Sequence, residues 1–524
     1  MKAPFYPVIY VRGYAMTANE RDETTADPFC GFNSGSTVYR ASIGRDEPPK
    51  KFVFESPLLR LMRDFDYQEV YENGSDIVDP DWHPRGSSVG ISSRSVVIYR
   101  YYESGSKLLG NGKPREIEEY SRGLGDLIAR VRELVLAQEG GPPEDFKCYL
   151  VAHSMGGLVV RGFLQNPALG TAEARQSVAK FFTYATPHNG IEVGGINVPS
   201  WLGFNEIDTF NRERMARLLC MQDVLKKYGR VDFMPASAMP IDNVFCMVGT
   251  NRADYDVAAG LSAAFVGHGS DGLVKIENAS LWALDENNQV TQPAAMGFTY
   301  RSHSGYFGIV NSEEAYQNLT RFLFGDVRVD IWLRVDSVRL PPTLQDKDVD
   351  ALYQFELRAG PRGKRWQLTR RLAEEDSPAC RTHAQLTDPA NAAPRQIYLS
   401  TVFLANRSRV NQDDPSLAYS MDLGIRVPDY EVKGRFWAGG HFEGAYLFRD
   451  GLVVKMVPPP APGGPWQVEY GWQSQAVGTA TRDLAYRELG EGKLELRIPF
   501  SNDGAPGITG EVLLTASAWN AGPA

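Results

Sequence analysis

The hydrophobic periodicity of this chain changes near Asp326, and that change limits the folds open to it. Before it, short apolar runs of strand length occur at 7–13, 95–102, 180–190 and 243–250, separated by helical stretches. The clearest of these stretches is 115–138, whose apolar residues recur every three or four positions and so line one helix face. Strands that alternate with helices predict a mostly parallel sheet covered by helices.

After Asp326 the apolar residues recur every second position. Val327, Val329 and Ile331 alternate with Arg328 and Asp330, and similar short runs follow as far as the end of the chain. This period of two predicts strands with one wet face. We therefore expect an α/β domain over 1–325 and an all-β, sandwich-like domain over 326–524.

Composition excludes several classes of function. The 524 residues carry a net charge of −9 and no run of Lys or Arg, so a nucleic-acid partner is not expected. The five cysteines form no C-x-x-C pair, which argues against a disulfide framework or a cysteine zinc site and fits a reducing compartment. We see no acidic cluster with calcium-ligand spacing, so no metal or cofactor is expected.

The first residues, MKAPFYPVIYVRGY, contain too short an apolar stretch for a secretory signal, and no window approaches the ~20 apolar residues of a membrane span. A cytoplasmic location is therefore expected. Signal-independent export of a lipid-attacking enzyme is an alternative that rests on analogy alone.

The stretch VAHSMGGLVV, 151–160, combines a serine with small neighbours. A β-prone run, 146–151, leads into Ser154, and an apolar run, 158–164, follows Gly156 and Gly157. A strand, a tight turn and a helix form the context of a nucleophile elbow, where bulky residues would clash. This context favours Ser154 as a nucleophile.

Four stretches in order make residues 1–325 resemble an α/β-hydrolase of the lipase and esterase branch. They are AHSMGG around Ser154, YATPHNG at 184–190, GSDGLVKIENASL at 269–281 and SHSGYFGIVNSEEAYQNLTRFLFG at 302–325. The first two are also similar to GPI inositol-deacylase-like enzymes. Most of 17–94 and the β domain lie outside the resemblance.

The resemblance implies a catalytic triad in the family's order Ser, acid, His, which gives Ser154, Asp271 and His303. Asp254 and Asp256 rank second for the acid. His303 is preferred as the base because it lies between an extended run and the last helix of the domain. The other histidines have weaker claims: His153 should point away from Ser154, His188 is interpreted as structural, His268 is too close to Asp271, and His83, His383 and His441 lack context.

The oxyanion hole of such an enzyme consists of backbone N–H groups. The resemblance implies that Met155 and Tyr14 supply them. Arg12 replaces the histidine that lipases commonly have before the glycine of this turn. Arg12 is interpreted either as a contact for an anionic substrate group or, preferably, as a surface or salt-bridged residue. Together with His188 it is a candidate substrate contact.

Two segments lie where lipases border their pocket. The insert 17–94 includes a helix that begins at Ser56-Pro57, with Leu58, Leu59, Met62 and Phe65 expected on its buried face. Residues 191–240 contain apolar and charged residues and are interpreted either as an interface-seeking lid or as a cap buried on the core.

These observations favour a serine hydrolase that cleaves carboxylic esters, with lipid esters as the preferred substrate, through an acyl-enzyme. The lid or the C-terminal domain would be the place of a membrane-surface contact. Acyl transfer by the same triad is a second interpretation. A non-catalytic lipid- or protein-binding module on a hydrolase fold is a third.

Overall fold

A computed structural model describes most of the chain. The described residues are 3–13, 37–40, 50–53, 55–70, 77–78, 82–84, 88–101, 115–193, 196–197, 210–252, 269–305, 307–409, 411–433, 441–457, 466–475, 482–483, 485–490 and 492–520. The chain divides into two compact units, and each is described separately below. The first unit spans Met1–Met296 and Tyr300–Leu319, and the second spans Gly297–Thr299 and Thr320–Ala524.

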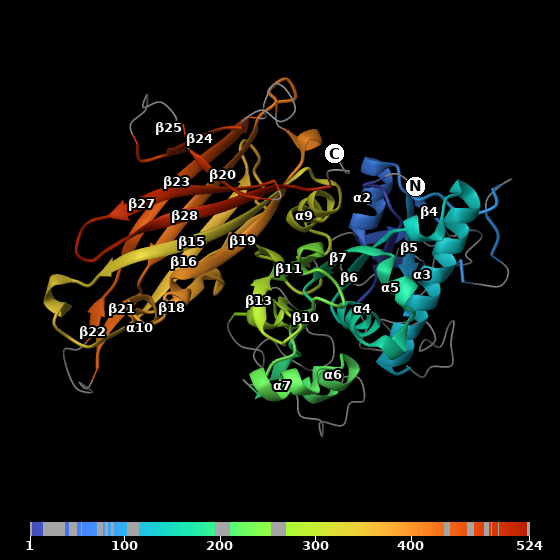
Figure 1. The fold of residues 1–524 in the computed structure, drawn as a ribbon, viewed down its shortest axis with the longest axis horizontal. Coiled ribbons are helices and arrows are strands. Elements are labelled where there is room, and N and C mark those ends of the chain that lie inside the picture. The colour runs from blue at the N-terminus through green and yellow to red at the C-terminus, as the bar shows by residue number, and fades with distance from the viewer. Residues whose placement is uncertain are drawn as a thin grey trace. The chain divides into compact units, whose positions relative to one another are not determined.

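The centre of the first unit is a seven-stranded sheet, counted over the described residues (Figure 1). Its order is β14 (Ala295–Thr299), β11 (Val244–Gly249), β7 (Val178–Tyr184), β6 (Cys148–His153), β1 (Val8–Val11), β5 (Ser95–Tyr99) and β4 (Gln68–Glu69). The pairs from β11 to β4 are parallel. The crossover order and the strand–turn–helix at β6 confirm the expected α/β-hydrolase fold.

Helices alternate along the chain with the strands of this sheet. They are α2 (Ser56–Phe65), α3 (Ile117–Glu139), α4 (Met155–Gln165), α5 (Ala172–Gln176), α6 (Arg212–Leu218), α7 (Gln222–Tyr228) and α9 (Glu313–Phe324). Of these, α3 packs against α4, and α4 packs on β1 and β6. Short strands make three further sheets: β2 (Thr37–Arg40) with β3 (Lys50–Val53); β8 (Glu192–Val193) with β9 (Ile196–Asn197); and β10 (Phe233–Pro235) with β12 (Trp282–Leu284) and β13 (Val290–Pro293).

The apolar patterns account for most of these elements. Strands β1, β6 and β11 are buried along their whole length, as continuous apolar strands in a parallel sheet should be. The predicted face of α3 is also buried. The prediction for α2 was partly wrong: Leu59 is 39% exposed, and Leu61 is buried instead. Leu58, Leu61 and Phe65 form the stripe, because residues three and four apart share a helix face.

Part of the segment 191–240 is a packed cap. On α6 and just beyond it, Met215, Leu218 and Leu219 are buried, as are Met221 and Val224. These residues therefore match the cap rather than an exposed flap. The apolar residues Trp201, Leu202 and Phe204 lie outside the described residues.

The second unit consists of antiparallel sheets. The five-stranded sheet, counted over the described residues, has the order β19 (Gln396–Leu404), β15 (Val327–Arg339), β28 (Gly507–Ala518), β27 (Lys493–Asn502) and β26 (Tyr486–Gly490). The other sheet contains β16 (Val349–Pro361), β17 (Thr369–Arg371), β18 (Ala379–Thr382), β20 (Leu417–Arg426), β21 (Asp429–Val432), β22 (His441–Glu443), β23 (Tyr446–Val457), β24 (Gln467–Trp472) and β25 (Arg482–Asp483). A short helix, α10 (His383–Thr387), follows β18.

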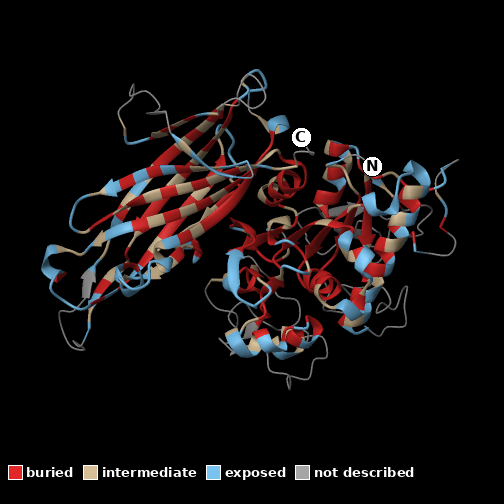
Figure 2. Cartoon of the chain, in the orientation of Figure 1, coloured by how far each residue is buried: buried red, intermediate tan, exposed pale blue. Residues whose placement is uncertain are grey.

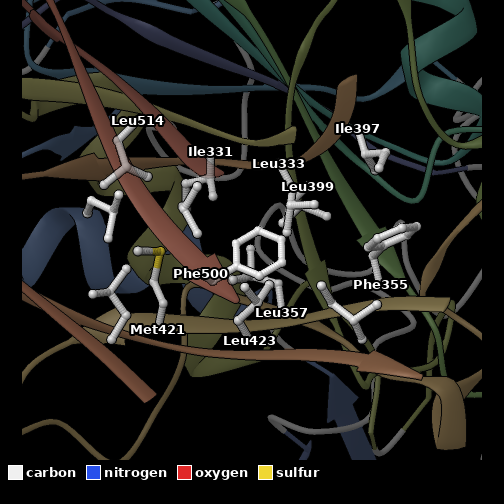
Figure 3. Close-up of a cluster of buried hydrophobic side chains, with 14 of the residues drawn as sticks. Ile331, Leu333, Phe355, Leu357, Ile397, Leu399, Met421, Leu423, Phe500 and Leu514 are labelled. Atoms are coloured by element: carbon white, nitrogen blue, oxygen red, sulfur yellow. The ribbon is translucent and has the colours of Figure 1, made fainter. Parts of the chain in front are cut away.

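Side chains from both sheets meet in one core. Figure 2 shows the alternation of buried and more exposed residues along these strands. On β15 the predicted inward residues Val329, Ile331 and Leu333 are fully buried. They share a cluster with Phe355 and Leu423 of the other sheet (Figure 3). Two sheets that face each other across a common core confirm the sandwich-like C-terminal architecture.

Among the described residues, no helix is both long enough and apolar enough to cross a bilayer.

One close contact in the first unit yields a test of the fold. A Cβ on Gly156, in α4, would collide with the carbonyl oxygens of Val11 and Arg12. These are backbone atoms that cannot rotate away. Gly156→Ala should therefore lower the free energy of unfolding of the first unit by about 1–3 kcal/mol. Differential scanning calorimetry measures this loss. The control is Gly471→Ala in β24, where an added Cβ meets nothing within 4 Å. Equal stability of the two variants would contradict the close approach.

Candidate active site

Ser154 lies at the turn between β6 and α4 and has a backbone conformation rare for a side-chain-bearing residue. Its φ is 52° and its ψ is −126°, and its N–H donates to the carbonyl of Tyr184 at 2.9 Å. A non-glycine residue with positive φ costs energy that the surrounding contacts must offset. This turn directs the Ser154 hydroxyl out of the strand direction, as in a nucleophile elbow.

The small residues after Ser154 make this turn sterically feasible. Gly156 lies against the backbone of Val11 and Arg12, and a Cβ on Gly157 would collide with the side chain of Thr186. Helix α4 can therefore start immediately beside β1 and the end of β7. The close packing at the start of α4 therefore explains why two glycines follow Ser154 and Met155 in the sequence.

Ser154, His303 and Asp271 form a continuous line of hydrogen bonds. The Ser154 Oγ lies 2.8 Å from His303 Nε2, and His303 Nδ1 lies 2.9 Å from Asp271 Oδ2. Both distances are those of good hydrogen bonds. His303 is 3% exposed, Asp271 is 1% exposed and Ser154 is 8% exposed. The three residues that the sequence analysis named are thus brought together from three separate loops.

The Asp271 carboxylate is fixed by its own loop. Its Oδ1 accepts hydrogen bonds from the N–H groups of Leu273 at 3.0 Å and Val274 at 2.8 Å. The carbonyl of Asp271 also accepts the backbone N–H of His303 at 3.0 Å. These backbone donors hold Oδ1, and Oδ2 is left to face the imidazole of His303. The D-G-L-V sequence is a local turn signal for such bonds.

These partners define the proton positions on His303. A carboxylate only accepts hydrogen bonds, so Nδ1 must carry the proton that is donated to Asp271. In the neutral ring, Nε2 is then an acceptor and receives the hydroxyl proton of Ser154. The imidazole is therefore oriented to remove a proton from the serine.

His153 is a site residue whose contact sequence reasoning missed. Its Nε2 lies 3.1 Å from the carbonyl oxygen of His303, and the two rings are 5.1 Å apart between centroids. Burial, followed by the nearby His303, holds the pKa of His153 well below its usual range. The neutral ring must carry its proton on Nε2 to donate to that carbonyl. His153 therefore supports the main chain of the loop that carries His303.

Arg161 is a second residue that sequence reasoning did not single out. It is fully buried in α4 and donates from Nη1 to the carbonyl of His188 at 2.8 Å. Its Nη2 donates to the carbonyls of Val231 at 2.7 Å and Phe233 at 2.8 Å. Arg161 thus links the helix of the elbow to the TPHNG loop and to the segment that follows α7. Its position in an apolar run gave no sign of these contacts.

His188 has the features of a structural residue. It is fully buried, and its Nε2 lies 3.3 Å from Thr183 Oγ1. Burial, followed by the charge of Arg161, holds its pKa well below the usual range. A neutral ring packed among strand residues fits the structural interpretation better than a substrate contact.

The predicted oxyanion donors are only partly described. Met155 is the first residue of α4, so its N–H belongs to the four at a helix N-terminus that lack an intrahelical acceptor. Tyr14 lies outside the described residues. Arg12, beside it, is fully buried, and its carbonyl accepts the Tyr101 hydroxyl at 3.0 Å. The preferred interpretation of Arg12 was a surface or salt-bridged residue, and its burial is incompatible with the surface position alone.

The remaining candidates can be reported briefly. Asp254, Asp256 and His268 lie outside the described residues. In the part of the chain that is described, no group of three or more His, Cys, Asp or Glu residues could hold a metal ion.

Comparison with known proteins gave matches among solved structures alone. No protein-family model matches the chain. No curated protein matches it either. The mature form of the lipase BlEst2 from Bacillus licheniformis matches with 12% identity and a TM-score of 0.27, over 59% of this chain and 89% of that one. Phospholipase PlaB from Legionella pneumophila matches with 13% identity and a TM-score of 0.30, over 80% of this chain and 86% of that one. The assignment of an α/β-hydrolase fold rests on the sheet order and the elbow described above.

Proposed function

We propose that this chain is a serine hydrolase that cleaves carboxylic esters, with lipid esters as its substrate class. The observation that supports this most is the line from Ser154 Oγ through His303 to Asp271, with bonds of 2.8 and 2.9 Å. A serine hydroxyl becomes a nucleophile when a base removes its proton and a third group orients that base. All three roles have a residue here.

The proposed reaction has two halves. Ser154 Oγ attacks the ester carbonyl carbon while its proton moves to His303 Nε2, and the imidazolium is stabilised by Asp271. The proton then passes to the departing alcohol as the C–O bond breaks, which leaves an acyl-enzyme. Water, deprotonated by the same nitrogen, then attacks the acyl carbon; the bond from that carbon to Ser154 Oγ breaks, and the proton on His303 Nε2 returns to Oγ as the acid leaves. The N–H of Met155 donates to the oxyanion in both halves of this proposed reaction.

An apolar residue near the base supports lipid esters as substrates. Phe307 is 53% exposed, and its carbonyl accepts the N–H of Ser302, the residue before His303, at 3.1 Å. The loop of the base therefore exposes an aromatic ring to solvent. Such a ring can cover an acyl chain.

Labelling with a fluorophosphonate probe tests the nucleophile. Peptide mass spectrometry should find the probe on Ser154, because only an activated serine attacks it readily. His303→Ala should slow labelling by a factor on the order of 10³ or more, since the base is lost. His83→Ala, which removes an exposed histidine, should leave the rate unchanged. Folded protein without label on Ser154, even in detergent, would refute the proposed reaction.

The lipid substrate class can be tested through Phe307. Phe307→Ser should lower kcat/KM for a long-chain p-nitrophenyl ester by about tenfold, because an aromatic contact worth roughly 1.5 kcal/mol is lost. Hydrolysis of the acetate should change little. Val290→Ser, another exposed apolar residue, is the matched control. If wild-type protein prefers the acetate and Phe307→Ser affects both esters alike, the substrate is not a lipid ester.

His153 provides a test of how the base is positioned. His153→Phe removes the donor to the His303 carbonyl and should lower kcat by about tenfold, with KM nearly unchanged, since one buried hydrogen bond is lost. His153→Gln keeps an N–H donor and should recover much of the loss. Because His153 stays neutral in the folded protein, His153→Gln should also retain the wild-type pH profile of kcat. If both variants lose the same activity and stability, the residue serves packing alone.

A further inference from the structure

The second unit contains a cavity of about 320 Å³ with an unusual charge for this chain. Arg321, Arg362, Arg409 and Lys455 line it, together with Asp414 as its one acidic residue. The whole chain has a net charge of −9. A cavity lined by four cations and one carboxylate is therefore positively charged in a chain whose net charge is negative. Its volume falls within the range of ligand pockets.

The single carboxylate of the cavity is already engaged. Asp414 Oδ2 lies 3.5 Å from Lys455 Nζ, and Asp414 Oδ1 accepts the N–H of Ser416 at 2.9 Å. The hydrogen bonds from Ser416, with Lys455, lower the pKa of Asp414. Its charge is thus matched by Lys455 and does not offset the charges of Arg362 and Arg409.

Two of the arginines have no carboxylate partner among the described residues. Arg409 donates from Nε to the carbonyl of Asn406 and from Nη1 to the carbonyl of Asp414, both at 3.0 Å. These neutral acceptors orient the guanidinium without cancelling its charge. Arg362 is exposed, and its backbone N–H donates to Ala418. Arg321, in contrast, is 3% exposed and lies over the ring of Trp366 at 5.1 Å.

A second cavity, of about 300 Å³, adjoins the first and is largely apolar. Val327, Pro415, Leu417 and Trp466 contribute to its lining. Arg409 and Leu417 line both cavities. Arg409 and Leu417 therefore form part of the wall of two neighbouring hollows, one lined by four cations and the other mainly by apolar side chains.

We infer that these two neighbouring cavities together bind an amphiphile, with its phosphate or carboxylate against Arg362 and Arg409 and its apolar chain against Leu417 and Trp466. Planar guanidinium groups match the oxygens of such anions and bind them by charge-assisted hydrogen bonds. The apolar hollow removes the chain from water. This binding site belongs to the second unit and does not depend on the proposed ester hydrolysis.

Titration calorimetry of the full-length chain with monomeric dodecyl phosphate tests the inference. The protein carries Ser154→Ala, so that hydrolysis plays no part. Dodecyl phosphate should bind, and inorganic phosphate should bind at least about tenfold more weakly, because it lacks the chain. Equal binding of the two probes, or binding of neither, would overturn the inference.

Matched variants locate the binding. Arg362→Gln and Arg409→Gln, combined, should weaken dodecyl phosphate binding by about tenfold or more, because charge-assisted bonds are lost. Arg487→Gln, which removes a 61% exposed arginine outside the cavity, should not. Thermal unfolding checks that both proteins are folded. An equal loss in both variants would contradict a built site.

A vesicle arm identifies the source of the anion. Flotation with vesicles of a neutral phospholipid, with and without an anionic phospholipid, is compared for the same variants. Binding to anionic vesicles that Arg362→Gln with Arg409→Gln abolishes supports a headgroup in a bilayer. Binding of monomeric dodecyl phosphate without vesicle binding supports a free amphiphile.

Discussion

The strained turn at Ser154 is the constraint on which the rest of the first unit depends. Ser154 has a positive φ between a buried strand and helix α4. This strained conformation is maintained because α4 begins in close contact with the neighbouring strands. That requires glycine at 156, beside the backbone of Val11 and Arg12, and glycine at 157, beside Thr186. The same closeness brings the Tyr184 carbonyl within 2.9 Å of the Ser154 N–H. The position where α4 begins and the direction of the Ser154 hydroxyl both depend on this turn.

Sequence reasoning succeeds where a local pattern determines the outcome. The period of two on β15 predicts which side chains enter the core, and Val329, Ile331 and Leu333 do so. The family order of Ser154, Asp271 and His303 locates three residues that lie in hydrogen-bonding contact in space. In each case the signal is short in sequence, either a repeat or a turn with characteristic small residues.

It fails where the deciding contact comes from elsewhere in the chain. His153 contacts the carbonyl of a residue 150 positions away, and no local pattern encodes this. Arg161 lies in an apolar run, but its carbonyl partners belong to two other segments of the chain. Arg12 was interpreted as a surface or salt-bridged residue from its charge, yet it is fully buried at the end of β1. Leu59 was predicted to lie on the buried face of α2, but it is exposed. Successive residues point in different directions around a helix, so Leu58 faces the core and Leu59 does not.

Arg161 recognises backbone rather than side chains. Its three carbonyl partners, at His188, Val231 and Phe233, exist whatever amino acids occupy those positions. The residues of the cap can therefore diverge widely in sequence while its attachment to the elbow helix persists. Substitutions in these segments can therefore accumulate while the helix that follows Ser154 keeps its contacts.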